Sequence, residues 1–494
     1  MKNNMLRSNE NKSYNQILKT TTVFGSVKIF SVLINLFKAK IIAIFLGPAG
    51  LGIYNLIQYQ VNIFSQVSNL GISTSGIREV AQATNQQTIN EVSTVIKYWN
   101  RITGVIGSIL LLILAAKISI WTFGNKEYTW AFQILSLAVF CTALGNEYEV
   151  LLRGLRQTKL VAKAGFYSAL IGFLLSIPFY YLWNTSGIVA VILITSVSLA
   201  SINYFYAQKS KIKNVKLPLK EIFFRGKNMA LLGFYIMLGD ILFTVIISIV
   251  NIYIRNTGGV SDVGLFQACM QITNSSINIV LVAMAADYFP RLANCQGNKK
   301  ESRLIASQQT EIAVLLSTPI IVSLIIFAPT VINILLSNDF ISIRSAISWF
   351  ILSTIFRLPS WSLNYYILAN GKTKLYILFV LINTLTLLIS YCTGYYIGGI
   401  KGMGIAYIIQ LSLYTIIQNI IIRIIFNIYL NKQFWTLYTI GCLICIFSLY
   451  IAEAIDNQKY IFGCLIVCSA FIYSTYFLVK KTSIINLLKK NRPK

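Results

Sequence analysis

The chain of 494 residues contains no histidine and only 15 acidic residues, against 42 lysines and arginines. The absence of histidine excludes the histidine-based zinc motifs, and no Walker-type phosphate loop or Rossmann fingerprint is present. Cys442 and Cys445 have the spacing of a metal-binding pair, but they lie in an apolar run typical of buried thiols. We therefore expect no metal, no cofactor and no enzymatic activity.

Charge of either sign is scarce. Charged residues make up 12% of the chain, against about 25% in soluble domains, while 56% of the residues are hydrophobic and the mean hydropathy is +0.68. The net charge of +27 does not require a nucleic-acid partner, because cytoplasmic loops of membrane proteins accumulate Lys and Arg. Attraction to anionic lipid explains the basic tail from Lys480 to Lys494 better than nucleic acid does.

Long apolar runs recur along the whole chain. A helix needs about 20 mostly apolar residues to cross a bilayer, and these runs lack the period-two alternation of β-barrel strands. They predict an all-α polytopic membrane protein with about 14 transmembrane helices, near residues 15–46, 51–77, 98–120, 128–152, 160–183, 187–208, 229–255, 262–290, 305–336, 345–369, 373–398, 402–428, 433–452 and 460–480.

The distribution of basic residues predicts the orientation. With the N-terminus in the cytoplasm, 31 Lys and Arg fall on the cytoplasmic side and 6 on the opposite side. This bias favours an even number of spans with both termini cytoplasmic. The remaining five lie within the predicted spans, where a charge is costly and usually functional; they are Lys19, Lys28, Lys38, Lys40 and Arg357.

A weak internal repeat divides the chain. At an offset of 212 residues Gly52-Ile53-Tyr54 matches Gly264-Leu265-Phe266, and at an offset of 215 Thr158-Lys159-Leu160 matches Thr373-Lys374-Leu375. A shift of six spans preserves orientation, so we predict two parallel-repeat six-helix lobes that face a cavity near mid-membrane. The predicted parts are an N-lobe at 1–208, a basic cytoplasmic linker at 209–228, a C-lobe at 229–432, and an extra helix pair with the basic tail at 433–494.

Polar side chains follow one face of several predicted spans. Span 1 carries Lys28, Ser31, Asn35 and Lys38; span 2 carries Asn55, Gln58, Asn62, Ser65 or Gln66, Asn69 and Ser73; span 8 carries Gln267, Gln271, Asn274 and Asn278. Further stripes are Asp240, Thr244, Ser248, Asn251 and Arg255 in span 7, and Ser353, Arg357, Ser360 and Asn364 in span 10. Such stripes either form hydrogen-bonded seams between helices or line water. The run of amides in span 2 favours a cavity suited to a ligand rich in hydroxyls.

The charges in the spans predict the sign of that ligand. Lys28, Lys38 and Arg357 would make the cavity positive, whereas Lys40 is rotated away from this stripe, and a guanidinium grips phosphate well. Asp240 could pair with a cation of the cavity, or titrate and couple a proton to transport. The other acids lie toward the cytoplasmic ends of their spans and are expected to be loop or interface residues; they are Glu147, Glu149, Asp287 and Glu311.

Several short motifs resemble the polysaccharide-transporter branch of the multidrug/oligosaccharidyl-lipid/polysaccharide (MOP) superfamily, and in particular its O-antigen and lipid-linked oligosaccharide flippases. The residues that carry the resemblance are Lys40 to Gly52 with Gly47-Pro48-Ala-Gly50, Gly71, Gly76, Gly154-Leu-Arg156 and Ser337-Asn-Asp-Phe340. The resemblance implies a cationic lumen and a cation near the end of span 1. The helical spacing of the span 1 stripe points to Lys38 as this cation, whereas the family pattern points to Lys40, so both remain candidates.

The leading hypothesis is a flippase that moves an undecaprenyl-pyrophosphate-linked glycan across the bacterial inner membrane by alternating access. The substrate would contact Lys28, Lys38, Lys40, Arg357, Asn35, Asn55, Gln58, Asn62, Gln66, Gln271 and Asn274, with Asp240 coupling a proton or other ion. A multidrug cation antiporter of the same superfamily is the first alternative, although it would favour an acidic cavity. A membrane-embedded glycan ligase or polymerase is the second, although the predicted outer loops are short.

Overall fold

The computed structural model describes residues 2–83, 85–209, 215–295, 298–454 and 459–481. Within these ranges the side chains of residues 2–33, 158, 228, 232, 235, 236, 286, 290, 293, 294, 373, 454 and 459 lie outside the description. The described chain is helical throughout and contains no strand. The all-α polytopic fold predicted from the apolar runs is therefore confirmed.

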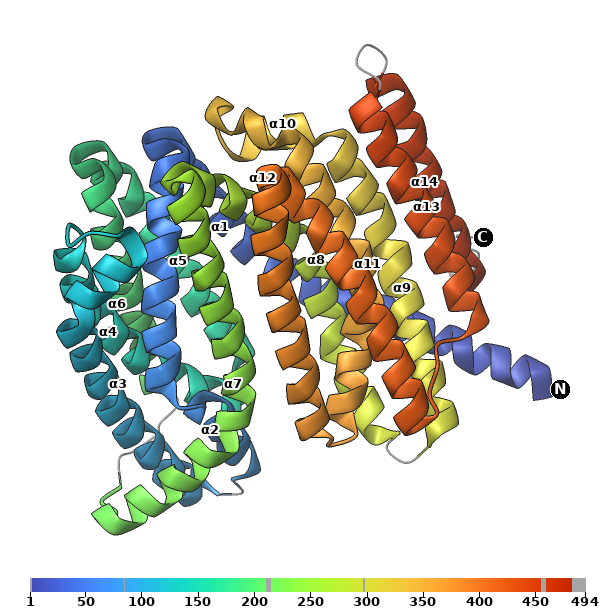
Figure 1. Ribbon diagram of the computed structural model, residues 1–494. Helices are drawn as coiled ribbons and strands as arrows, with labels where there is room; N and C mark the ends of the chain where they lie inside the picture. Colours follow the sequence, from blue (N-terminus) through green and yellow to red (C-terminus); the bar gives the residue numbers. More distant parts are fainter. Residues whose placement is uncertain (1, 84, 210–214, 296–297, 455–458, 482–494) are drawn as a thin grey trace, which may run out of the picture. The chain divides into compact units, whose positions relative to one another are not determined.

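The helices follow one another with short connections (Figure 1). Their bounds are α1 Lys2–Asn69, α2 Ile72–Gln82, α3 Gln86–Phe123, α4 Thr129–Gly154, α5 Thr158–Trp183, η1 Asn184–Ser186, α6 Gly187–Gln208, α7 Leu219–Gly258, α8 Val260–Asn294, α9 Lys299–Ile326, α10 Ala328–Leu335, η2 Asn338–Ile343, α11 Arg344–Ala369, α12 Thr373–Phe426, α13 Lys432–Ala454 and α14 Lys459–Lys481. Helix α7 begins at Leu219, within the range 209–228 that the sequence analysis assigns to the linker.

Two of the long helices are hairpins bent at glycine. In α1 the bend lies at Gly47 (φ 62°, ψ −165°), and Lys38 Nζ comes within 5.3 Å of the Tyr54 ring centre. Sixteen residues of straight helix would separate these groups by about 24 Å. In α12 the bend lies at Gly398 and Gly399, and Gln410 Nε2 donates to Asn383 Oδ1 at 3.1 Å.

Eleven stretches of the described residues are long and apolar enough to cross a membrane. Three of them, Ile34–Asn69, Lys159–Gln208 and Lys374–Phe426, are 36, 50 and 53 residues long. Each contains a reversal, at Gly47, at η1 and at Gly398–Gly399 respectively, so each makes two crossings. The observed helices thus account for the 14 predicted crossings.

The chain separates into two compact units. The first comprises Leu33–Gln267, and the second comprises Ala268–Lys494 together with Met1–Val32. In the first unit α3 packs on α4, α4 and α5 pack on α6, and α7 packs on α2 and α3. In the second unit α11 packs on α12, while α9 contacts α11, α13 and α14. The division into two lobes separated by residues 209–228 was based on the sequence repeat, and it stays a prediction.

The extra helix pair is an integral part of the second unit. α13 and α14 run side by side (Figure 1) and both pack on α9. Tyr473 Oη donates to the carbonyl of Leu437 at 2.7 Å, and Ser474 Oγ donates to the carbonyl of Leu315 at 2.7 Å. These bonds fix α14 on α13 and α9.

A close backbone contact joins two segments related by the predicted repeat. A Cβ atom on Gly52 would overlap the carbonyl oxygen of Val260, and one on Gly264 would overlap that of Pro48. A shift of 212 residues carries Pro48 onto Val260 and Gly52 onto Gly264, so the two contacts are related to each other by the offset of the predicted repeat. Only glycine permits backbones to approach this closely.

We predict that Gly52→Ala separates the segments and destabilises the protein by about 1–3 kcal/mol, the usual cost of overpacking. Thermal unfolding of the purified protein in detergent measures the effect. Gly165→Ala is the control, because no atom lies within 4 Å of its added Cβ. Equal unfolding temperatures for the two variants would contradict the contact.

Candidate functional site

Lys38 lies before the Gly47 bend of α1, and its side chain contacts Tyr54, which lies after the bend. It is half-buried, and its ammonium group lies 5.3 Å from the Tyr54 ring, where a cation–π contact contributes about 0.5–2 kcal/mol. Within the described ranges it forms no ion pair. Lys40 is also half-buried, and Asn35 is exposed. The side chain of Lys28 lies outside the description, so its predicted position is untested.

The amides of span 2 are hydrogen-bonded inside the first unit. Asn55 Nδ2 donates to the carbonyl of Leu51 at 2.9 Å, and Gln58 Nε2 donates to Asn62 Oδ1 at 2.9 Å. Gln58 and Asn62 are half-buried, and their bond is local to one helix face. These amides satisfy one another without a partner helix, which leaves their remaining donors and acceptors available to a ligand.

A second set of polar groups forms the seam between α1 and α7. Gln66 Nε2 donates to Thr244 Oγ1 at 3.0 Å, and Gln60 Nε2 donates to Ser248 Oγ at 2.8 Å. Sequence reasoning placed Gln66 in the cavity and overlooked Gln60, which is only 1% exposed. Gln60 lies off the helical stripe of span 2, so only the polar stripe of span 7 could have pointed to it.

The seam continues into the start of α8. Gln267 Nε2 donates to Asn251 Oδ1 at 2.8 Å, and Tyr59 Oη donates to Gln267 Oε1 at 3.5 Å. All three residues belong to the first unit. The polar stripe of span 7 thus serves chiefly to bind its neighbours, which is the seam alternative left open by the sequence.

The seam ends at a cavity of about 320 Å³ that contains Asp240. Its lining residues are Gln66, Asn69, Gly71, Thr74, Met237, Asp240, Phe243 and Thr244. Among the described side chains none forms an ion pair or a hydrogen bond with the carboxylate of Asp240. An acid within a span is therefore open to a cavity of the first unit.

The other acids within the predicted spans are paired. Glu147 is fully buried and accepts two hydrogen bonds from the guanidinium of Arg101, at 3.0 and 3.2 Å. The remaining ion pairs are Glu149–Arg153, Asp287–Arg291 and Glu311–Lys481. Because these four carboxylates are neutralised by neighbours, Asp240 is set apart from them.

Arg357 lies on α11 in the second unit. Its Nη1 donates to Asn274 Oδ1 at 3.3 Å. The side chain is half-buried and forms no ion pair within the described ranges. Gln271, one turn earlier on α8, is also half-buried. Among the described residues, its hydrogen-bond partner is the neutral amide of Asn274.

The rest of the α11 stripe packs against α12. Ser360 shares a hydrogen bond with Thr415, and Gln418 Nε2 donates to Asn364 Oδ1 at 2.7 Å. Arg357 therefore stands on the α8 side of α11, just before Pro359 within the helix. The structure brings together Arg357 and Asn274, whereas it binds Ser360 and Asn364 to another helix.

Comparison with protein families gives a match over residues 41–345 to the model described as polysaccharide biosynthesis protein. The chain belongs to this family. The match begins at residue 41, so it includes the span 1 motif as far as Gly52 but starts one residue after Lys40. The resemblance inferred from the short motifs is thereby confirmed.

Individual relatives of this family member are distant. The lipid III flippase of Escherichia coli K12 is 22% identical over 348 residues, which cover 69% of this chain and 82% of the relative. The solved structure of the lipid II flippase MurJ in an inward closed conformation has a TM-score of 0.71 at 14% identity and covers 93% and 99% of the two chains. An inward-facing multidrug resistance MATE transporter of the MOP superfamily has a TM-score of 0.66 at 17% identity and covers 83% and 96%. The two structures share the fold of this polysaccharide biosynthesis protein.

The Arg101–Glu147 pair predicts an asymmetric response to mutation. Arg101 is half exposed in its side chain (51%), whereas Glu147 is not exposed at all. Arg101→Gln leaves the buried carboxylate of Glu147 without its ion-pair partner and should lower the free energy of unfolding by roughly 3–5 kcal/mol. Glu147→Gln leaves the half-exposed guanidinium of Arg101 unpaired and should lower it by less. Thermal unfolding of both single variants and of the double variant measures the difference. Equal losses in the two single variants would refute this account.

Proposed function

We propose that this protein is a flippase for an undecaprenyl-pyrophosphate-linked oligosaccharide, such as an O-antigen repeat unit or a similar surface polysaccharide unit. It would act in the bacterial inner membrane by alternating access, with both termini cytoplasmic. Membership of the polysaccharide biosynthesis family and the named activity of the distant lipid III flippases support this proposal.

The observation that carries the proposal is the environment of Arg357. Its guanidinium is hydrogen-bonded to the neutral amide of Asn274, and no carboxylate neutralises it among the described residues. A pyrophosphate is a strong anion, and a guanidinium can bind it with two parallel hydrogen bonds. Lys38, held over the Tyr54 ring, supplies a second charge of the same kind in the first unit, and we propose the same role for Lys28 and Lys40.

The sugar part of the substrate would exchange hydrogen bonds with amides. Gln58 and Asn62 bond to each other on one helix face, and such a bond can be replaced by bonds to sugar hydroxyls at little net cost. We propose the same contacts for Asn35, Asn55, Gln66, Gln271 and Asn274. Gln66 already binds Thr244, so its contribution would come from its oxygen or its second donor hydrogen.

Asp240 is the proposed coupling group. Its carboxylate lines a cavity and, among the described side chains, lacks the basic partner that each of the four other acids has. A carboxylate without a fixed cation can change its protonation state as its surroundings change, which a permanently paired acid cannot do. A proton would then bind and leave at Asp240 during the transport cycle.

A multidrug cation antiporter is the competing function, because MATE transporters share this fold. Likeness of fold alone does not transfer an activity. A site for cationic drugs would favour unpaired acids around its ligand. Among the described residues of the predicted polar stripes, two cations without an ion pair, Lys38 and Arg357, stand against one such acid, Asp240. The described electrostatics therefore favour the anionic substrate.

Arg357→Gln and Lys38→Gln should each slow flipping of a fluorescent lipid-linked oligosaccharide in proteoliposomes by roughly 10- to 100-fold, because each removes a charge-assisted contact of about 1.5–3 kcal/mol. Lys117→Gln is the matched control, since Lys117 is exposed. The Lys28→Ala, Arg357→Ala double variant should abolish surface glycan in cells while still inserting in the membrane. Normal flipping in the Arg357 and Lys38 variants would reject the site.

Asp240→Asn should uncouple transport from a proton gradient while leaving substrate binding intact, since asparagine keeps the shape of the side chain but cannot titrate. Accumulation against a gradient, measured with and without a pH difference across the vesicle, tests this. Glu127→Gln, which alters an exposed acid outside the spans, is the control. A pH-driven rate equal to that of the parent protein would eliminate Asp240 as the coupling group.

A further inference from the structure

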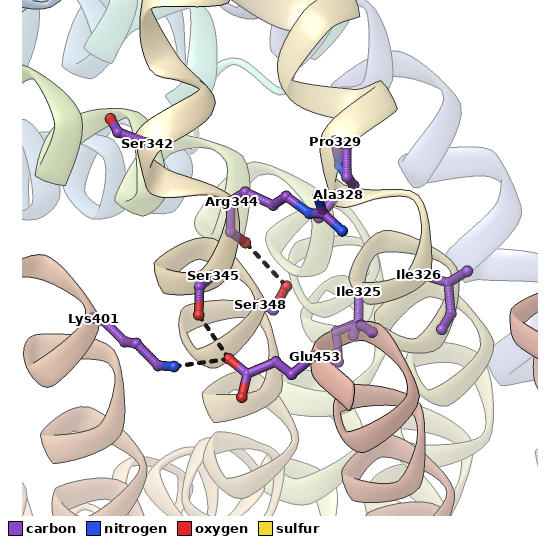
Figure 2. Close-up of a pocket in the computed structure, with 11 residues that line it drawn as sticks. Ile325, Ile326, Ala328, Pro329, Ser342, Arg344, Ser345, Ser348, Lys401 and Glu453 are labelled. Atoms are coloured by element: carbon purple, nitrogen blue, oxygen red, sulfur yellow. Dashed lines mark hydrogen bonds and ion pairs between the residues drawn. The ribbon is translucent and has the colours of Figure 1, made fainter. Parts of the chain in front are cut away.

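A polar pocket in the second unit has no part in the proposed transport site. It has a volume of about 460 Å³ and lies where α9 ends, α10 and α11 begin, α12 bends and α13 ends (Figure 2). Its lining residues are Ile325, Ile326, Ala328, Pro329, Ser342, Arg344, Ser345, Ser348, Lys401, Ala452 and Glu453.

Glu453 organises one wall of this pocket. A single carboxylate oxygen, Oε1, accepts hydrogen bonds from Ser345 Oγ at 2.7 Å and Trp349 Nε1 at 2.9 Å, and it pairs with Lys401 Nζ at 3.1 Å. Lys401 also lies 5.9 Å from the Trp349 ring centre. The charges of Glu453 and Lys401 therefore cancel within a fixed network.

Arg344 supplies the remaining charge. Its guanidinium forms no ion pair within the described ranges, and in Figure 2 its side chain extends toward Ala328 and Pro329. These two residues begin α10, whose helix dipole adds partial positive charge at this end. The pocket consequently has a net charge of one positive unit and favours an anion.

The opposite wall is apolar. Ile325, Ile326, Ala328, Pro329 and Ala452 contribute it, whereas three serine hydroxyls and Arg344 face from the polar side. A small soluble anion would gain no binding energy from an apolar wall, because it has no apolar surface to bury. A lipid does, because its phosphate can bind Arg344 while the first carbons of its tail pack against the isoleucines.

We propose that this pocket binds the phosphate head group of an anionic lipid at the extracytoplasmic membrane surface. The side follows from the predicted orientation, which places Arg344 and Lys401 outside. The phosphate can come from a bilayer phospholipid or from the flipped cargo; only the second source rests on the proposed function. The proposal also gives the extra helix pair a role, because α13 carries the Glu453 that neutralises Lys401.

Binding to the full-length protein in detergent, measured by native mass spectrometry, tests the pocket directly. The probes are phosphatidylglycerol, undecaprenyl phosphate and inorganic pyrophosphate, with zwitterionic phosphatidylcholine as the reference. We expect at least one anionic lipid to bind more tightly than phosphatidylcholine and inorganic pyrophosphate, and the tighter of the two lipids identifies the source. Stronger binding of pyrophosphate than of either lipid would overturn the lipid assignment.

Two variants shift the affinity in opposite directions. Arg344→Gln should weaken binding of the anionic lipid roughly tenfold or more, and Arg344→Lys should restore part of it. Glu453→Gln keeps the hydrogen-bond acceptor but frees the charge of Lys401, so it should strengthen binding several-fold. Lys126→Gln, an exposed lysine of the first unit, is the control and should bind as the parent does.

Unchanged binding in Arg344→Gln, or weaker binding in Glu453→Gln, would overturn the proposal. The assay involves no transport, so its result is independent of the flippase test. Loss of lipid binding with normal flipping would reject only the pocket as a functional site. Retained binding with no flipping of any lipid-linked glycan would reject only the proposed function.

Discussion

A charge inside the hydrocarbon must be paired or hydrated, and this constraint arranges most of the described ionisable groups. Removing an isolated carboxylate from water costs several kcal/mol even after relaxation. Glu147 meets the constraint with Arg101, and Glu311 meets it with Lys481 from the end of α14. The second pair also ties the last helix to α9, so the same electrostatic need that neutralises an acid holds the extra helix pair in place.

The proposed function depends on the described groups within the spans that form no ion pair. Arg357 is bound by an amide and Lys38 by an aromatic face, and both partners are neutral. A neutral partner orients a cation without cancelling its charge, whereas a carboxylate would do both. Asp240 completes the contrast, since its carboxylate faces a cavity. The proposed flippase, with an anionic substrate and Asp240 as its coupling group, would need this division between paired and unpaired charges.

The sequence predicted the fold well because hydropathy reports the length of each crossing. Long apolar runs located the hairpins of α1 and α12, and the glycines between them marked the bends. Helical periodicity likewise assigned Gln66 and Arg357 to polar faces. It could not say what those faces meet, because periodicity fixes the angle of a side chain on its own helix and carries no information about the neighbouring one. Gln66 proved to bind Thr244, and Gln60, outside the stripe, proved to bind Ser248.

The close contact at Gly52 and Gly264 follows the sequence repeat directly, whereas the polar stripes did not reveal which helices they contact. Its two halves, Gly52 against Val260 and Gly264 against Pro48, are related by one offset of 212 residues. Two equivalent segments that cross at their shortest side chains can approach backbone to backbone, and any larger residue at either position would separate them. Glycine at these two positions therefore has a steric reason that hydropathy does not record. A repeat detected through such residues carries information about packing, which the neighbouring apolar residues, being interchangeable in lipid, do not.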